Sequence, residues 1–494
     1  MVLGLLGGTA VAQDGEARLD DAGLMARLAA EDVQRPVFHA APPVFTMGDP
    51  NGLIQVGGVY HLFYQHARTL GPEPRMHWGH SRSRDLVRWE SLPVALTPEA
   101  YYHIASGSAV DNGGEITAIY TGAEPQQQCL AMATDPDLVH WRQYEGNPVI
   151  AGPPDGLAVT GFRDPCVWRE GDRWLMAVGS GVRHIGGVIL LYGSPDLRAW
   201  TYLGPLCTGN NRETGDMWEC PSFFELGGRY VLVFNALPLP VDPSRMKAMY
   251  MVGAYEDGVF TRESLADLDL FGEVWAPQVF TDERGRRVLL AMAWEQRDAR
   301  PHGWSGCMTF PREVWADRKG RVGFRPVEEL QSLRVDGGAG GPFSAEGPFV
   351  PAPEPCLGGD GLEVRAVFRP EPTGGFAAER FGLVVRRSPG GEEETRVYYD
   401  THERRVGIDR SRSSLDASAA SGERLDRGAF ASGEGEPLAL HVIIDRSVVD
   451  VFVNDRAAGT TRIYPTRADS VDVGVFADRG TVRVESIETW RLAP

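Results

Sequence analysis

Three acidic residues, each in a distinctive local context, are the strongest candidates for chemistry in this sequence. Asp49 lies in the segment MGDPNG, Asp164 in FRDP and Glu219 in MWECP. Two carboxyl groups about 5–5.5 Å apart can cleave a glycosidic bond with retention of configuration, because one attacks the anomeric carbon while the other protonates the leaving oxygen. These residues are far apart in the sequence. Only a fold that brings separate units to a common axis, such as a propeller, can place them together.

Each motif by itself also has a simpler explanation. The segment DPNG is a good turn sequence, in which Asp49 would act as a cap. Arg163 and Asp164 could form an ordinary surface ion pair, worth under about 1 kcal/mol. Glu219 could be a solvated strand residue beside Trp218. For any one motif this explanation is as good as the catalytic one, so the argument depends on their combination.

A short motif that recurs three times indicates how the chain is organised. SRDLVRW at 83–89 is followed by DPDLVHW at 135–141 and by SPDLRAW at 194–200. The interval is roughly 50 to 60 residues, the size of a four-stranded propeller blade. Blades cannot bury their hydrophobic faces alone and must stack radially. About 300 residues at this period give about five blades, unless D-L-x-x-W is a common hairpin element repeated by chance.

The rest of the sequence favours an all-β protein with two domains. A chain of 494 residues usually exceeds a single core. Short apolar strands such as 59–64, 116–120 and 230–234 alternate with Gly, Pro, Asn and Asp turns. We therefore predict a five-bladed β-propeller over residues 36–336, a Gly/Pro-rich boundary at 337–342 and a β-sandwich over residues 343–494.

Residues 1–35 form an N-terminal segment ahead of the propeller. Spaced Leu and Met side chains between Ala17 and Val33 predict one amphipathic helix. The apolar residues 1–13 end in Ala-Val-Ala-Gln and resemble the end of a signal peptide, although the run is short and has no basic n-region. This pattern slightly favours a secreted or periplasmic protein over a cytoplasmic one.

Charge and cysteine content argue against several classes of partner. The net charge of −18 disfavours nucleic acid or an anionic membrane surface, because either would repel the protein. The six cysteines are scattered without a CxxC pair or a Cys/His cluster, so we expect buried thiols and no metal site. We also expect no organic cofactor. The sequence carries no signal for an oligomeric state.

Together and in this order, the three acidic motifs resemble those of glycoside hydrolase family 32, the invertase, levanase and inulinase family. Its typical motifs are WMNDPNG, RDP and ECP. The resemblance runs from about Phe45 to the end of the chain. Further matching segments are YHLFYQ (60–65), HWGHS (77–81), SGS (106–108), NPVI (147–150), WAPQ (275–278), GWSG (303–306), PRE (311–313), DRS (445–447) and VFVN (451–454).

The resemblance implies a role for each candidate residue and a sucrose or fructan substrate such as levan or inulin. Asp49 would be the nucleophile and Glu219 the general acid/base. Asp164, with Arg163 beside it, would hold fructose hydroxyls and favour an oxocarbenium-like transition state. Asp49 must then be ionised and Glu219 protonated near the working pH, which burial or neighbouring charges could achieve. Further substrate contacts are expected at Gln65, Ser106, Trp78, Cys220, Trp275 and Trp294.

Several positions depart from the family pattern around the expected fructose pocket. Gly48 stands where Asn usually precedes the nucleophile. Leu70 stands where many members have Trp, and Ala105 where Phe usually precedes SGS. Ser222 replaces the usual Asp after ECP, and Trp275 replaces a usual Tyr. Because two aromatic walls are lost, we expect sucrose to stack more weakly and a fructan to be preferred.

Other interpretations share these motifs. If a sugar hydroxyl intercepts the fructosyl-enzyme faster than water does, the protein is a fructosyltransferase, including the levan fructotransferase type that forms a difructose anhydride. Both reactions would use the same three acids. Loss of Asp49 or Glu219 would favour a non-catalytic carbohydrate-binding propeller, and both are present. A five-bladed glycosidase acting on arabinose-containing polymers is disfavoured by the C-terminal motifs.

Overall fold

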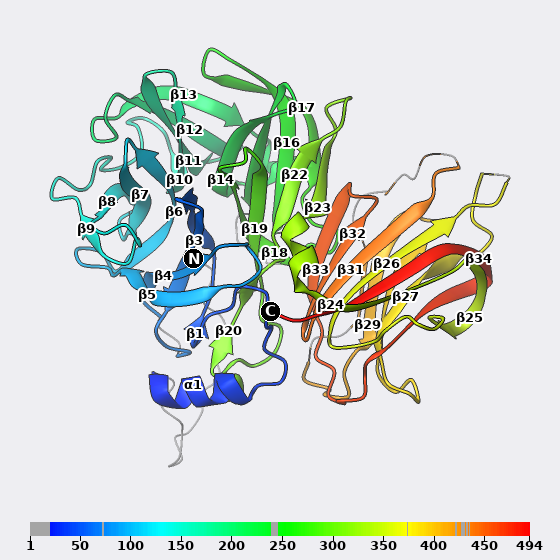
Figure 1. The fold of residues 1–494 in the computed structure, drawn as a ribbon. Coiled ribbons are helices and arrows are strands. Elements are labelled where there is room, and N and C mark those ends of the chain that lie inside the picture. Colours follow the sequence, from blue (N-terminus) through cyan, green and yellow to red (C-terminus); the bar gives the residue numbers. More distant parts are fainter. Residues whose placement is uncertain are drawn as a thin grey trace.

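The protein contains a five-bladed β-propeller and a C-terminal sheet domain that lie side by side, with the C-terminus between them (Figure 1). The structure is a computed structural model that describes residues 20–494 apart from 72–73, 239–245, 373, 420–421, 426–429, 431–432 and 434. The predicted all-β class, with a propeller followed by a sandwich-like domain, is confirmed.

The propeller consists of five antiparallel sheets that follow one another along the chain. The first strands of the five blades contact one another in the cyclic order β2, β6, β10, β14, β18 and back to β2, so they are the innermost strands. The blades are β2 (Pro50–Val56), β3 (Val59–Ala67), β4 (Met76–Ser83) and β5 (Glu90–Leu96); β6 (His103–Asn112), β7 (Glu115–Ala123), β8 (Gln127–Ala133) and β9 (Trp141–Gln143); β10 (Val159–Glu170), β11 (Arg173–Val182), β12 (Gly186–Ser194) and β13 (Thr201–Thr208); β14 (Met217–Leu226), β15 (Arg229–Leu237), β16 (Lys247–Glu256) and β17 (Val259–Asp267); and β18 (Val274–Thr281), β19 (Arg287–Ala293), β22 (Arg312–Ala316) and β23 (Val322–Pro326), with β21 (Cys307–Met308) beside β19.

A break in strand pairing recurs in every innermost strand. Bulges of this kind bend a strand and re-aim the side chains next to them. The candidate acids lie at or beside three of these breaks, so the bulges contribute to turning them away from the blade faces. The register shifts lie between Asn51 and Ile54 in β2, Ile104 and Gly107 in β6, Arg163 and Cys166 in β10, Glu219 and Ser222 in β14, and Trp275 and Gln278 in β18.

The repeated D-L-x-x-W motif forms the same turn between the third and fourth strands of the first three blades. In each copy an aspartate accepts hydrogen bonds from backbone amides ahead of it, as Asp196 does from Arg198 and Ala199 at 2.9 Å. The leucine is buried at a positive φ, and in the second and third copies the tryptophan Nε1 donates to its carbonyl at 2.7 Å. The leucines are Leu86, Leu138 and Leu197.

The C-terminal domain is a sheet that folds over on its longest strand, β34 (Asp472–Leu492). Residues 472–478 of this strand pair with β27, and residues 483–491 pair with β26, so one strand belongs to both layers. The apolar side chains enclosed between the layers form a separate core. The other strands are β24 (Arg334–Gly340), β25 (Phe343–Pro351), β26 (Gly361–Arg369), β27 (Arg380–Arg387), β28 (Glu394–Asp400), β29 (Arg405–Arg412), β30 (Glu423–Leu425), β31 (Leu438–Asp445), β32 (Val448–Val453) and β33 (Ala457–Arg462).

The Gly/Pro-rich stretch at 337–342 is not a free boundary segment, which corrects the sequence-based interpretation. Its first four residues lie in β24, which pairs with β34 from Arg334 onward. Gly338 has no room for a side chain, because a Cβ there would lie 2.1 Å from the carbonyl oxygen of Pro355. The glycines therefore allow close packing within the C-terminal sheet.

Short elements complete the propeller. The expected N-terminal helix is α1 (Ala22–Glu31), capped by Asp21, whose carboxylate accepts from the Leu24 amide at 3.0 Å.

The signal-peptide interpretation concerns residues 1–13, which lie outside the described residues. Among the described residues, no helix has the length and apolar composition needed to cross a membrane. The other elements are β1 (Phe45–Thr46), which pairs in parallel with β20 (Trp304–Ser305), α2 (Asn211–Thr214), η2 (Arg300–His302) and η3 (Glu328–Leu333).

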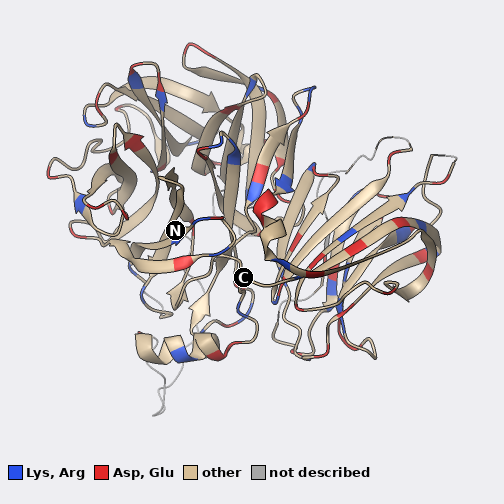
Figure 2. Ribbon diagram, viewed as in Figure 1, with Lys and Arg blue, Asp and Glu red and all other residues tan. Residues whose placement is uncertain are grey.

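A buried histidine joins the start of the propeller to the C-terminal sheet. His39 Nδ1 lies 2.9 Å from Asp445 Oδ2, and its Nε2 lies 2.8 Å from Asp450 Oδ2. All three side chains are fully buried. Although burial favours the neutral imidazole, the hydrogen bonds and charges of the two aspartates raise the pKa of His39 to about 9. Elsewhere charges of both signs are interspersed over both domains (Figure 2).

We predict that His39→Gln destabilises the protein most below about pH 6.5. A histidine whose pKa rises from 6.5 to about 9 on folding contributes stability that is fully present below 6.5 and is lost as pH rises through 9. The contribution corresponds to about 3 kcal/mol. Thermal unfolding of both proteins between pH 5.5 and 10 would measure it, with the exposed His402→Gln as control. A difference that stays constant with pH would contradict a charged His39.

Candidate active site

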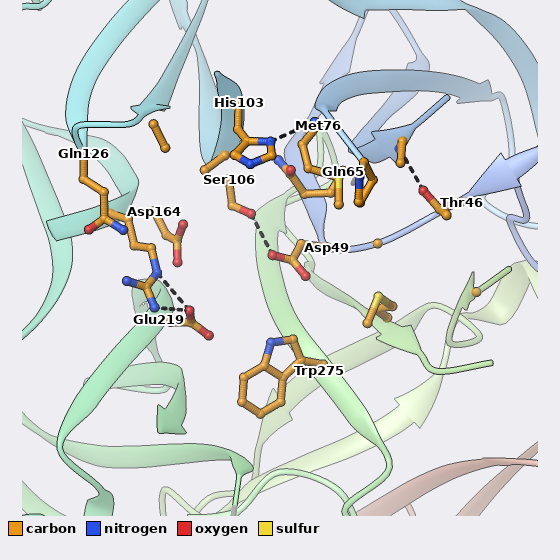
Figure 3. A pocket seen from close by; sticks show the side chains of 18 of the residues that line it. Thr46, Asp49, Gln65, Met76, His103, Ser106, Gln126, Asp164, Glu219 and Trp275 are labelled. Carbon is orange, nitrogen blue, oxygen red and sulfur yellow. Dashed lines mark hydrogen bonds and ion pairs between the residues drawn. The ribbon is translucent and has the colours of Figure 1, made fainter. Parts of the chain in front are cut away.

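A cavity of about 1560 Å³ lies where the innermost strands converge, and Asp49, Asp164 and Glu219 all line it. These residues come from three different blades, and their carboxyl groups turn into the same space (Figure 3). The structure therefore brings together the three acids that the sequence singled out. All three are largely buried, so their charges interact in an environment with little water.

Asp49 is held in place just before β2 by backbone pairing with β3. The Gly48 amide donates to the Gln65 carbonyl at 2.8 Å, and the Gln65 amide donates to the Asp49 carbonyl at 2.9 Å. The Ser106 hydroxyl donates to Asp49 Oδ2 at 2.8 Å. A Cβ at Gly48 would lie only 3.1 Å from the Cβ of Gln65. The glycine that replaces the usual Asn therefore fits the close approach of these two segments.

Asp164 is positioned by contacts from two neighbouring blades. Its backbone has a φ of +63°, a conformation that is uncommon for residues other than glycine. Its amide donates to Thr121 Oγ1 at 2.9 Å, and its carboxylate accepts from the Cys220 amide at 3.1 Å. The carboxylate is therefore fixed from both sides at the β10 bulge.

Glu219 forms a buried ion pair with the residue that precedes Asp164. Arg163 Nε donates to Glu219 Oε1 at 2.8 Å, and Nη2 of the same guanidinium donates to the same oxygen. The side chains of Arg163 and Glu219 are 15% and 9% exposed, respectively. Since both bonds reach Oε1, Oε2 is the oxygen of Glu219 that remains for a ligand.

The proximity of three carboxyl groups changes how two of them ionise. Burial and the charges of Asp164 and Glu219 raise the pKa of Asp49 to about 7, and the Ser106 hydrogen bond opposes this rise. Burial and the charge of Glu219 raise the pKa of Asp164 to about 6, against the opposing effect of Arg163. Asp49 was expected to be ionised, yet without a ligand it carries a proton in a substantial fraction of molecules at neutral pH.

Most of the other predicted contact residues also line the cavity. Gln65, Ser106, Arg163, Trp275 and Trp294 belong to its wall. Of the two tryptophans, Trp294 is the more exposed, at 39%, whereas Trp275 is 7% exposed.

Two predicted contacts lie behind the wall, which corrects the sequence-based prediction. Trp78 is fully buried, and its Nε1 donates to the Ala105 carbonyl at 2.9 Å, so it supports the wall without facing the cavity. Cys220 is 2% exposed, and its Sγ lies 3.5 Å from Asp164 Oδ2. Cys220 therefore supports Asp164.

The departures from the family pattern fall into two groups. Leu70 and Ala105 both lie on the cavity wall, as expected. Ser222 does not line the cavity, because its Oγ accepts from the Val279 amide at 3.1 Å and links the fourth blade to the fifth. Gly48 and Trp275 also line the cavity, so every departure except Ser222 lies where a ligand would meet it.

Sequence reasoning missed several residues that shape the site. Thr121 holds Asp164, and His103 and Gln126 line the cavity. Asn235 lies behind Trp275, and with its amide oriented to satisfy its neighbours it accepts from Trp275 Nε1 at 3.1 Å. Thr121 and Asn235 belong to second strands and Gln126 to a turn, where no chemical motif marks them. Only their position in the fold reveals them.

Metal ligation has no candidate group in the part of the chain that the structure describes. No cluster of three or more His, Cys, Asp or Glu side chains is arranged to hold an ion there. The six cysteines are free thiols, four of them buried. The acidic side chains on the cavity wall include Asp49, Asp164 and Glu219, and Glu219 is bound to the Arg163 guanidinium.

Family models match nearly the whole chain. The model of the glycosyl hydrolases family 32 N-terminal domain matches residues 39–326, and that of the family 32 C-terminal domain matches residues 350–491. These two regions correspond to the propeller and to most of the C-terminal sheet.

Individual relatives match more than nine tenths of this chain. A sucrose-6-phosphate hydrolase from Zymomonas mobilis is 35% identical, over 92% of this chain and 92% of that protein. A levanase from Bacillus subtilis is 32% identical, over 93% of this chain and 71% of the levanase. The crystal structure of fructan 1-exohydrolase IIa from Cichorium intybus superimposes with a TM-score of 0.81 at 27% identity, covering 93% of this chain and 97% of that one.

We predict that Asp49→Asn stabilises the protein at and above neutral pH. The pKa of Asp49 rises from 3.8 to about 7 on folding, so the fold favours its protonated form. The contribution of Asp49 to the free energy of unfolding is therefore most favourable below about pH 4, and it is lost as pH rises through 7. The neutral amide avoids this loss, which corresponds to a few kcal/mol by pH 8. Melting temperatures at pH 4 and pH 8 would measure the gain.

The exposed Asp155→Asn is the matched control, because it removes the same charge at the surface. Its melting temperature should follow that of the wild type at both pH values. An Asp49→Asn protein that melts at or below the wild-type temperature at pH 8 would contradict the electrostatic cost assigned to the site.

Proposed function

The chain belongs to glycosyl hydrolase family 32 and is a glycosidase of the β-fructofuranosidase type, and we propose that it hydrolyses neutral β-fructofuranosides, sucrose or a fructan, with retention of configuration. One observation carries the mechanism. Asp49 and Glu219, from the first and fourth blades, line one cavity and are close enough for the charge of Glu219 to shift the ionisation of Asp49. An effect of one carboxyl group on the ionisation of another is expected where both face the same substrate.

In the first step, an Asp49 oxygen attacks the anomeric carbon of the fructosyl unit while Glu219 protonates the glycosidic oxygen. The bond to the leaving sugar breaks, and a covalent fructosyl-enzyme forms. Ser106 stabilises the ionised form of Asp49 through its hydrogen bond to Oδ2. Because Arg163 occupies Glu219 Oε1, the proton for the leaving oxygen is assigned to Oε2.

In the second step, Glu219 removes a proton from water, and the water oxygen attacks the same carbon and releases Asp49. The positive charge that develops on the fructosyl ring is offset by Asp164, which the Thr121 and Cys220 contacts fix beside Asp49. Substrate expels water and brings its own hydroxyl groups to these acids. The proton that Asp49 carries in the empty site must be lost before the attack.

The charge of the cavity favours an unphosphorylated sugar. Among the described residues that line it, six are acidic and two are basic. Arg163 is paired with Glu219 and Arg300 with Asp298, so each cation is already matched by a carboxylate. A phosphate dianion would enter a negative field without a dedicated cation there. Sucrose or fructan therefore fits this cavity better than sucrose 6-phosphate. This holds although one relative is named a sucrose-6-phosphate hydrolase.

The cavity walls favour a longer substrate. Leu70 and Ala105 lie on the wall and present less apolar surface for stacking than the aromatic residues usual at these positions. A volume of about 1560 Å³ is larger than one disaccharide needs. A fructan, which spreads its contacts over more of this surface, is the preferred substrate in this proposal.

We predict that Asp49→Asn lowers kcat by at least about a thousandfold on sucrose and inulin, because the amide cannot form the covalent intermediate. Glu219→Gln should lower activity most on substrates with poor leaving groups, which need protonation. Initial rates with chromatographic identification of the products would test both variants. A folded Asp49→Asn protein that kept more than about a thousandth of the wild-type rate would rule out its role as nucleophile.

The same product analysis at high substrate concentration separates hydrolysis from transfer. Hydrolysis gives free fructose, whereas transfer gives longer oligosaccharides or a difructose anhydride. Since water and a sugar hydroxyl attack the same intermediate, the two outcomes share every residue named above.

We predict that kcat/KM for sucrose exceeds that for sucrose 6-phosphate by at least about tenfold at low ionic strength, because repulsion by the acidic lining falls on the phosphate alone. Raising the salt concentration should narrow this ratio. Rates for both substrates at 20 mM and 300 mM salt would measure the effect. Equal or higher kcat/KM for the phosphorylated sugar would show that a cation outside the described lining residues recognises it.

A further inference from the structure

Arg410 is a buried cation of the C-terminal sheet that reaches the propeller. It lies in β29, and its side chain is fully buried. Its guanidinium donates to Thr461 Oγ1 at 2.7 Å and to the Arg462 carbonyl at 3.0 Å, both in strand β33 of the same sheet. These contacts fix the guanidinium within the C-terminal domain. The mechanism proposed above gives Arg410 no role.

The same guanidinium bonds two residues of the fifth blade. Nη1 and Nη2 donate to the two carboxylate oxygens of Glu273 at 3.1 and 3.0 Å. Nη1 also donates to Gln296 Oε1 at 2.8 Å, and Gln296 Nε2 donates to Glu273 Oε2 at 3.0 Å. The Glu273 side chain is 10% exposed. A bidentate pair between arginine and carboxylate is geometrically specific, and a low local dielectric strengthens it.

Glu273 and Gln296 lie at the end of the β18–β19 hairpin that carries two tryptophans of the cavity wall. Glu273 immediately precedes β18 and is two residues before Trp275, while Gln296 follows β19 and is two residues after Trp294. The strands β18 and β19 pair at this end. Arg410 therefore holds together the two chain segments from which these tryptophans project.

A second side chain of the C-terminal domain holds the backbone next to Trp294. The Gln296 amide donates to the Tyr464 hydroxyl oxygen at 3.0 Å. The Tyr464 hydroxyl in turn donates to Glu295 Oε1. The two residues that follow Trp294 are therefore both bonded to the C-terminal domain.

The Trp294 ring is open to a ligand. It lines the cavity and is 39% exposed. Its centroid lies 6.3 Å from that of the Trp275 ring, at an interplanar angle of 55°. Trp275 itself faces the space that the Asp49 and Glu219 carboxyl groups share (Figure 3). An indole face offers a sugar apolar surface, so the orientation of the Trp294 ring affects how a substrate is held.

We propose that Arg410 is a positioning residue for substrate binding: by holding Glu273 and Gln296 it orients the Trp294 ring against Trp275 on the cavity wall. This inference rests on the proposed function. Arg410 does not line the cavity, so it acts only through these propeller residues. The C-terminal sheet thereby takes part in sugar binding without touching the sugar.

The main test compares Arg410→Met and Arg410→Lys on sucrose and inulin. We expect Arg410→Met to raise KM by about three- to tenfold and to change kcat by less than about twofold, because a contact shared by bound substrate and transition state is lost. Arg410→Lys keeps a charge opposite Glu273 but not the planar fork, so it should recover only part of the loss. If Arg410→Met does not fold, Gln296→Leu removes the uncharged link alone and should also raise KM.

Arg312→Met is the matched control at the same domain boundary. Arg312 is also fully buried and bonds Asp269 and Thr460, and none of these three residues lines the cavity. Both arginine variants should lower the melting temperature, but Arg312→Met should leave KM within about twofold of the wild-type value. An equal rise in KM for both variants would mean that the boundary acts generally, which would overturn the role of Arg410.

A double-mutant comparison shows whether Arg410 acts through Trp294. In a Trp294→Ala background, Arg410→Met should change KM by less than about twofold, because the ring that it orients is gone. The same rise in KM in both backgrounds, or no rise in the wild-type background, would contradict the proposal.

Ring orientation can also be measured without activity. The tryptophan emission of each protein minus that of its Trp294→Phe counterpart isolates Trp294. Acrylamide should quench this difference more strongly in the Arg410→Met protein than in the wild type, and equal quenching would overturn the positioning role. If the wild-type protein hydrolyses neither sucrose nor inulin, the proposed function fails, whereas the quenching result still decides whether Arg410 orients the ring.

Discussion

Three carboxyl groups line one cavity, and the propeller must hold them there against their mutual repulsion. Their repulsion, together with the loss of water around them, raises the pKa of Asp49 and of Asp164. A flexible scaffold would separate the groups or admit water between them. The closed ring of innermost strands keeps the groups together, because each strand contacts its two neighbours around the axis.

Local features turn this constraint into a working site. The bulges of β10 and β14 place Asp164 and Cys220 at positive φ values, and the hydrogen bond between them joins two blades. Arg163 supplies a cation that is directly bound to Glu219. The site is therefore stabilised by a few directed contacts and not by solvent, as expected where preorganised charge stabilises a transition state.

The C-terminal sheet stabilises the propeller from outside. Buried ion pairs connect the two domains, as in His39 between Asp445 and Asp450. Arg312 of the fifth blade donates both to Asp269, which lies between the fourth and fifth blades, and to Thr460 of the C-terminal sheet. The C-terminal sheet contacts the fifth blade through β19 and β23, which lie against β33. A ring that must confine like charges benefits from a partner domain that fixes its last blade.

The sequence by itself determined the elements that are local in the chain. Sequence patterns could predict the D-L-x-x-W turns, the alternating strands and the three acidic motifs, because each of these depends on neighbouring residues. Together they indicated the five blades and the three acids. Tertiary structure alone decided what depends on partners far along the chain. Trp78 and Cys220 support the wall, while Gly337 and Gly338 lie within a paired strand. Arg410 bonds Gln296 and Glu273, which precede it in the chain by 114 and 137 residues. Burial, ionisation and contacts of this kind are set by surrounding atoms from distant parts of the chain, and no local pattern of residues contains them.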